Sequence, residues 1–175
     1  ASPLIKPFSF QLDKTRVPVS VSLDDRTLAV DVPAGAPDTA VPALPDPVPW
    51  TDPPGEAMVE LPLVRLAWAR SGDKGDISNI GLIARRAEWM PLLWDRLTPE
   101  VVQAWFAHLV RGRVERFYLP GLPAMNLVLH EALDGGGPGS PRLDPLGKGM
   151  AQMLLEMPLR VPAAWMQPGG GSASA

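Results

Sequence analysis

Residues 59–85 read VELPLVRLAWARSGDKGDISNIGLIAR, and this stretch decides the fold. Apolar residues alternate with small or charged ones from Val64 to Arg70, as in a half-buried strand. A second apolar run extends from Asn79 to Arg85. Between the two runs, residues 71–77 are polar and contain two glycines, which favours a turn. The stretch therefore predicts two neighbouring strands joined by a short charged turn.

Helical and extended patterns continue after this pair of strands, without a βαβ nucleotide-binding fingerprint. This order predicts an α+β fold, with a sheet that carries its helices on one face, rather than a doubly wound parallel sheet. The expected later elements are helices at 87–97 and 98–111, a strand at 113–119, helices at 123–133 and 147–157, and a strand at 159–161.

The first 58 residues differ in composition from this domain. Two alternating runs on either side of Asp24 predict a β-hairpin, and an isolated hairpin is marginal in water, so we expect it to dock on another structure. Eight prolines follow, and Trp50 is the expected anchor of this proline-rich part on a folded surface. The predicted limits are 1–32 for the hairpin extension, 33–58 for the Pro-rich linker or arm, 59–162 for the packed domain and 163–175 for a flexible tail.

Composition argues against several classes of protein. The chain has 175 residues, no cysteine and a net charge of −3, so we expect no disulfide or thiol chemistry and no nucleic-acid partner. No long apolar run is present, which predicts no membrane span and favours a cytoplasmic protein. The two histidines have no metal-ligand spacing, and we expect no metal.

The first candidate site is the charged turn between the two strands. Successive backbone N–H groups of such a turn can form a nest that binds an anion, and Arg70 and Lys74 would strengthen it. Asp73 and Asp76 could accept from N–H groups, pair with these cations or act as a general base. The alternative is a solvated turn whose polar side chains serve the local backbone. The residues assigned to this candidate site are Arg70, Ser71, Gly72, Asp73, Lys74, Gly75, Asp76 and Asn79.

The second candidate site lies in and before a glycine-rich loop. Arg142 and Lys148 follow the glycines of residues 135–139 and could bind a phosphate or a carboxylate, with Asn126 further upstream. The alternative is a mobile loop in which Arg142 and Asp144 form an ordinary surface pair.

These two segments resemble the C-terminal domain of the acyclic-terpene-utilisation (AtuA-like) family. The resemblance rests on RSGDKGD at 70–76 followed by NIG at 79–81, and on FAHLV at 106–110, VERFYLP at 114–120 and NLVLH at 126–130. The glycine-rich loop ending in Arg142, Asp144, Gly147 and Lys148 follows in the same order, although Pro141 stands where the family often has leucine. The resemblance implies a ferredoxin-like α+β domain.

The family implies a partner and a pathway. Its small domain usually follows a large domain of the AtuA type, so the hairpin would be the end of that domain, and the start at Ala1 suggests a processed or excised chain. The family is associated with the catabolism of acyclic terpenes and branched acyl-CoA compounds. We therefore expect part of a hydratase or lyase site, shared with the large domain, in a homo- or hetero-oligomer.

In this hypothesis Asp73, Lys74 and Asp76 are catalytic, the other candidate residues bind the substrate, and the substrate is a coenzyme A thioester with no separate cofactor. The alternative is a non-catalytic assembly module, in which the same polar motifs fix an interface between domains or subunits. The resemblance assigns no residue a catalytic role, and a fold does not establish a mechanism.

Overall fold

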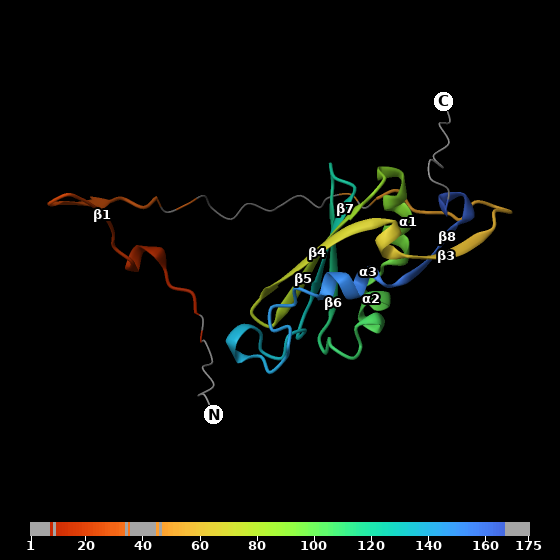
Figure 1. Ribbon diagram of the computed structural model, residues 1–175. Helices are drawn as coiled ribbons and strands as arrows, with labels where there is room; N and C mark the ends of the chain where they lie inside the picture. Colours follow the sequence, from red (N-terminus) through yellow and green to blue (C-terminus); the bar gives the residue numbers. More distant parts are fainter. Residues whose placement is uncertain (1–7, 9, 34, 36–44, 46, 167–175) are drawn as a thin grey trace. The chain divides into compact units, whose positions relative to one another are not determined.

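The computed structural model describes residues 8, 10–33, 35, 45 and 47–166 (Figure 1). Contacts divide the chain into a small unit, residues 6–43, and a main unit that includes residues 44–175. Much of the predicted linker, and the predicted tail from residue 167 on, lie outside the described residues, and the predicted domain limits stay a prediction. The short 3-10 helices are η1 (Lys14–Arg16), η2 (Leu63–Arg65), η3 (Ala87–Trp89), η4 (Gly137–Gly139) and η5 (Ala163–Met166).

The small unit contains the expected hairpin. Strands β1 (Val19–Leu23) and β2 (Arg26–Val30) are antiparallel, and every residue in them is exposed. Since side chains alternate, one face of the hairpin is apolar and the other carries mainly hydroxyl groups. The apolar face includes Val19, Val21, Leu28 and Val30, which are 41–62% exposed. The hairpin thus has an apolar face that the described residues leave uncovered.

The main sheet has four antiparallel strands in the order β4-β5-β7-β6. Their bounds are Ala67–Lys74 for β4, Ile77–Ala84 for β5, Val114–Leu119 for β6 and Ala124–Leu129 for β7. Strands β5 and β6 run parallel, with β7 between them, and helices connect them, which makes a split βαβ unit. In the usual ferredoxin-like order, a strand that follows the last helix forms the edge of the sheet beside the first strand. Here β4 occupies that edge position beside β5, although β4 comes first in the chain. The α+β ferredoxin-like prediction is confirmed in a permuted order.

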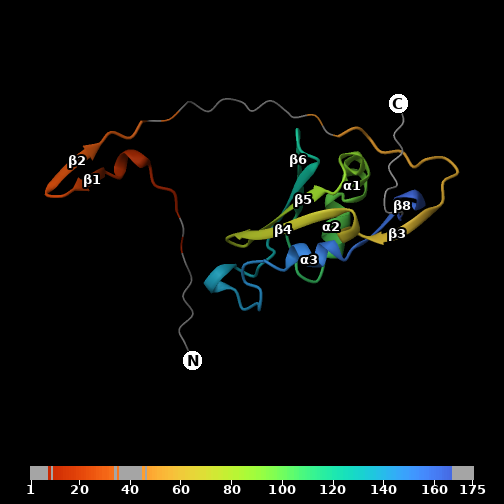
Figure 2. The same ribbon diagram turned by 45° about the horizontal axis from the view of Figure 1, so that its top comes forward.

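Helices α1 (Met90–Arg96), α2 (Pro99–Trp105) and α3 (Met150–Leu155) cover one face of this sheet (Figure 2). Thr98 caps α2 by accepting a hydrogen bond from the Val101 amide, as its position before Pro99 predicts. The core lies between these layers and includes Ile80, Leu82, Leu93, Leu127 and Phe106, all with 0% exposure. Burying such side chains stabilises the fold by roughly 1.5–3 kcal/mol each.

A second, two-stranded sheet lies at one end of the main unit. Strands β3 (Met58–Pro62) and β8 (Pro158–Pro162) are antiparallel and bring the two ends of the domain together. Beyond β8, η5 continues the packed structure, and the Trp165 ring stacks on Trp89 at 4.9 Å between centroids. Trp50 packs edge-on against the same ring at 5.7 Å, so its predicted anchoring role is confirmed.

Several expected elements differ in the structure. The strand expected from Val64 begins at Ala67, after η2, and the helices expected at 98–111 and 147–157 are shorter, at Pro99–Trp105 and Met150–Leu155. Residues 123–133 do not form a helix but contain strand β7. The spacing of four between Met125 and Leu129 fits both a helix and alternate residues of a strand, and Leu127 completes the buried strand face. The turn expected at 71–77 is also shorter: β4 continues to Lys74, and Gly75 and Asp76 alone connect it to β5.

The glycine-rich loop packs tightly on this two-residue turn. Gly136 has a φ of +66°, and a Cβ on it would lie 1.8 Å from the Gly75 carbonyl oxygen. Contacts at this distance are impossible, so the loop can approach the turn only with glycine at this position. The two segments that the sequence singled out are therefore neighbours in space.

Replacing Gly136 with alanine tests this packing. We expect Gly136→Ala to lower the free energy of unfolding of the full chain by at least about 2 kcal/mol, because it combines a strained backbone with a steric clash. Gly139→Ala is the matched control, since a Cβ there meets nothing within 4 Å. The control should change stability by less than about 0.5 kcal/mol in urea unfolding. Equal stability of the two variants would contradict the packing.

Candidate functional site

The sheet face opposite the helices carries an ordered set of side chains, which we call the open face. Because side chains alternate along each strand, the strand register arranges the outward residues in four rows. The first row is Trp68, Ile83, Ala124 and Leu119; the second is Arg70, Gly81, Asn126 and Phe117; the third is Gly72, Asn79, Val128 and Glu115; the fourth is Lys74, Ile77, His130 and Arg113. The open face thus changes from apolar to polar along the strands.

A groove of about 680 Å³ occupies the apolar half of the open face. Its apolar walls include the exposed side chains of Trp68, Ile83 and Leu122, and Arg85 stacks 4.5 Å above the Trp68 ring. Arg70, Asn79 and Asn126 line the polar end of the same groove. A mostly apolar hollow that ends in a few polar groups is the usual form of a small-molecule site.

Two glycines, Gly72 and Gly81, leave positions of the open face without a side chain, and Gly81 lies in the lining of the groove. Neither Gly72 nor Gly81 has a positive φ, so the backbone does not require glycine at either position. A Cβ on Gly81 would have the Arg70 carbonyl oxygen, at 3.9 Å, as its nearest neighbour. Glycine inside a strand lowers stability, and it often marks the close approach of a ligand or another backbone. Above Gly72 the neighbour is Lys148 Nζ, which would lie 3.4 Å from a Cβ, whereas Gly81 lies in the groove and points to a ligand above the sheet.

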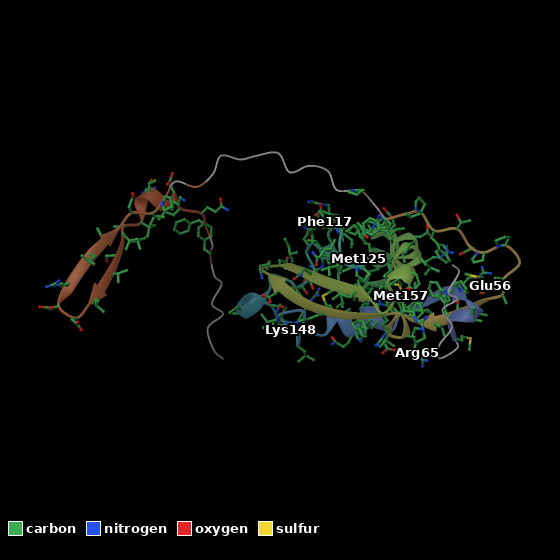
Figure 3. The ribbon with its side chains drawn as sticks, turned by 90° about the horizontal axis from the view of Figure 1, so that it is seen from above. Glu56, Arg65, Phe117, Met125, Lys148 and Met157 are labelled. Carbon is green, nitrogen blue, oxygen red and sulfur yellow. The ribbon has the colours of Figure 1, made fainter. Side chains whose placement is uncertain are left out.

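The polar end of the groove contains a pair of side-chain amides beside a lysine. Asn79 Nδ2 donates to Asn126 Oδ1 at 3.4 Å, which joins β5 to β7 across the open face. A Cβ on Gly72 would lie 3.4 Å from Lys148 Nζ and 3.7 Å from Asn79 Oδ1. The ammonium group of Lys148, which is labelled in Figure 3, thus lies next to the edge strand, at the end of the amide pair. The structure brings Arg70, Gly72, Asn79, Asn126 and Lys148 together.

The predicted catalytic residues are distributed differently. Consecutive strand residues point to opposite faces, so Lys74 lies on the open face and Asp73 on the helix side. Lys74 Nζ donates to the Asp73 carbonyl oxygen at 3.0 Å. Asp76 Oδ1 accepts from the Leu133 and Gly135 amides, both at 2.9 Å, so this carboxylate holds the glycine-rich loop. The catalytic roles of the three residues stay predictions.

Ser71 and Gly75, the remaining residues of the first motif, serve the fold. Ser71 is buried, donates to the Lys148 carbonyl oxygen and accepts from the Ala151 amide, both at 3.0 Å. It thereby holds the start of α3 against β4. Gly75 adopts a φ of +63°, which the two-residue turn requires.

Arg142 is an internal crosslink in this structure. Its guanidinium group donates to the Asp134 carboxylate at 2.7 Å, to the Leu109 carbonyl oxygen at 2.8 Å and to the Ala132 carbonyl oxygen. The hydrogen bond from Arg142 is the main cause that lowers the pKa of Asp134. Asp144 is likewise engaged, because it accepts from the Lys148 and Gly149 amides, both at 2.8 Å. Arg142 and Asp144 therefore do not form the surface pair that the sequence offered as the alternative.

His130 and Glu115 form a close pair on the open face. His130 Nε2 lies 2.5 Å from Glu115 Oε2, and Arg113 reaches the same oxygen at 3.2 Å. The hydrogen bond to His130 is the largest cause of a lowered pKa for Glu115. Neither residue was among the sequence candidates. The alternation around Glu115 was visible, but pairing it with His130 requires the register of β6 and β7.

A smaller hollow of about 340 Å³ lies on the helix side, where Leu133, Met150 and Met153 line it and His108 stands at its rim. Arg142 and Asp144 contribute to its wall, but both are engaged in the contacts described above. Within the part of the chain that the structure describes, no cluster of His, Asp or Glu side chains suits a metal ion. No helix in that part has the length and apolar character needed to cross a membrane.

The Glu115 pair gives a pH dependence that can be measured. A carboxyl group whose pKa is lowered in the folded state adds stability above its ordinary pKa of 4.5, and this contribution disappears as the pH falls. We expect wild type to exceed Glu115→Gln in urea midpoint at pH 5.5, and the difference to shrink below pH 4.5. Glu60→Gln, at an exposed position of β3, controls for the loss of one carboxylate. A difference that stays constant down to pH 3 would contradict this role.

Comparison with known proteins identifies the family of the main unit. The family model described as AtuA ferredoxin-like domain matches residues 61–160. No curated protein matches the chain, and no solved structure does. The matched residues include all four strands of the main sheet, the three helices and both sequence motifs. Because the match covers more than half of the chain, this protein belongs to the AtuA ferredoxin-like domain family.

Proposed function

We propose that this domain binds a branched acyl-CoA compound across its open face, as part of a hydratase or lyase site shared with a larger domain. The family resemblance supports the pathway, and the groove on the open face supports the location. The observation that carries the proposal is the groove, because its floor contains Gly81, its walls are apolar and its end contains the amide pair.

The dimensions of the open face suit an amphipathic ligand of this kind. Strand residues rise by about 3.3 Å, so the first and fourth rows are roughly 20 Å apart. A branched chain of ten carbons would lie over the Trp68 row, and its carbonyl group would reach the amide pair. The anionic remainder would then extend toward the polar rows.

Charge favours the same orientation. The chain has a net charge of −3, yet its polar rows carry cations from β4, from the residue before β6 and from the loop before α3. Glu115 is the carboxylate in these rows, and it is paired with His130 and Arg113. The cations in these rows, together with Lys148, are Arg70, Lys74 and Arg113. Such a surface attracts phosphate and carboxylate groups.

Acid–base chemistry at this site requires side chains that are not already held in hydrogen bonds to distant segments of the domain. Asp76 and Arg142 are engaged in internal contacts. Asp73 and Lys74 therefore remain the candidates for proton transfer among the residues of the two motifs. Both lie at the tip of the β4–β5 hairpin, Lys74 at the polar end of the open face and Asp73 on the helix side, and a larger domain that covers this tip could complete the site.

An assembly module is the second candidate function, and the hairpin in the small unit favours it. Its apolar face is as exposed as the groove walls, which is costly unless another structure covers it. We propose that this face binds a larger domain or subunit of the AtuA type. The two functions are compatible, because the groove and the hairpin consist of different residues.

Filling the groove tests the first proposal. We expect Gly81→Val to weaken binding of a C10 branched acyl-CoA by at least tenfold in calorimetry, while thermal stability stays equal or rises, because valine favours strands. Glu60→Val introduces the same side chain at an exposed position of β3 that does not line the groove, and this variant should bind as wild type does. Unchanged binding by Gly81→Val, or equal binding of the acyl-CoA and free CoA by wild type, would remove the proposal.

A charged residue on the apolar face of the hairpin tests the second proposal, that this face binds a larger domain or subunit. Leu28→Asp places a carboxylate on the apolar face and should release the chain from its native assembly in light scattering. Thr27→Asp places the same charge on the hydroxyl face and should leave the assembly intact. If both variants assemble equally well, the apolar face is not the contact.

A further inference from the structure

The amide pair at the end of the groove has a defined direction. Asn79 donates through Nδ2 to Asn126 Oδ1, and Asn79 Oδ1 points toward Gly72. Lys148 Nζ lies beside the same glycine. A cation on that side favours the amide orientation that turns the Asn79 oxygen toward it and the Asn79 nitrogen away from it.

This direction determines what Asn126 presents to the groove. Its oxygen already accepts from Asn79, so its Nδ2 group carries the donors that remain. On the open face, Asn126 stands between Gly81 and Phe117 in the second row. Gly81 has no side chain, so the space beside the Asn126 amide lies over the floor of the groove.

We propose that Asn126 Nδ2 donates a hydrogen bond to the carbonyl oxygen of the bound acyl group. Asn79 and Lys148 are positioning residues, which hold the Asn126 amide with its nitrogen toward the ligand. This inference rests on the proposed acyl-CoA function and deepens it, because it states which atom of the ligand is recognised. The site then selects a carbonyl compound over an equally apolar compound without one.

The preference for a carbonyl compound arises because a ligand without the carbonyl group leaves the Asn126 amide without a hydrogen-bond acceptor. A ligand that covers the amide without accepting its hydrogen leaves a donor removed from water and unpaired, and this is unfavourable. Sites that hydrogen-bond one substrate atom discriminate strongly against analogues that lack it. The apolar rows, by contrast, bind the branched chain in both cases.

The test compares two ligands that differ only in the carbonyl oxygen. The first is a C10 branched acyl-CoA thioester, and the second is the matching S-alkyl-CoA thioether, in which CH₂ replaces the carbonyl group. In calorimetry with the full chain, we expect wild type to bind the thioester at least tenfold more tightly. Asn126→Leu should bind the two ligands within about threefold of each other. Asn126→Asp should also lose the preference, because its carboxylate accepts hydrogen bonds and repels the carbonyl oxygen.

Lys148→Met is the second variant, and it changes an exposed side chain, so the fold should persist. It should reduce the preference for the thioester to a value between those of wild type and Asn126→Leu. Lys14→Met, in the small unit, controls for the loss of one positive charge and should keep the full preference.

The outcomes separate the inference from the proposed function. If wild type binds the thioester and the thioether equally, and both more tightly than free CoA, the groove binds the chain but the carbonyl inference is overturned. If the preference survives in Asn126→Leu, another donor recognises the oxygen and the inference is also overturned. If wild type binds neither ligand better than free CoA, the proposed function itself fails.

Discussion

The carboxylate of Asp76 is the interaction on which the rest of this domain depends. One of its oxygens accepts the amides of Leu133 and Gly135, which lie 57 and 59 residues later in the chain. The Ala132 amide adds a bond to the Asp76 carbonyl oxygen, and Gly136 fits against Gly75 without a side chain. The β4–β5 turn and the glycine-rich loop are therefore one structure. Hydrogen bonds from backbone amides to a charged carboxylate are stronger than those to a neutral acceptor.

The geometry of the open face follows from this junction. Beyond this loop, Arg142 bonds to Asp134 and Asp144 accepts the Lys148 amide, which holds residues 142–148 against the domain. Ser71 accepts the Ala151 amide and so holds the start of α3. Lys148 then stands at the edge of β4, where Gly72 gives its ammonium group access to the end of the amide pair. The polar side chains of the two motifs thus divide into two sets. Ser71, Asp76, Arg142 and Asp144 build the scaffold. Arg70, Asn79, Asn126 and Lys148 meet at the polar end of the groove.

The sequence predicted the pair β4–β5 and the hairpin because both rest on local alternation, and it predicted the α+β class from the order of helical and extended patterns. It did not predict β7, since residues four apart share a face in a helix and in a strand alike. It also ended β4 too early, because Ser71 and Gly72 resemble turn residues until their distant partners Lys148 and Ala151 are known. The open face depends on strand register, which no local pattern contains. For the same reason Glu115 and His130 could not be paired in advance.

One measurement tests the central claim that the open face binds an acyl-CoA compound. The full chain, labelled with ¹⁵N, would be titrated with a C10 branched acyl-CoA while backbone and side-chain N–H resonances are followed by NMR. We expect shifts at Gly81, at the Asn126 side-chain amide and at the Trp68 indole, with little change at His108 and Met153, which line the hollow on the helix side. Shifts confined to His108 and Met153, or no shifts at saturating ligand, would contradict it.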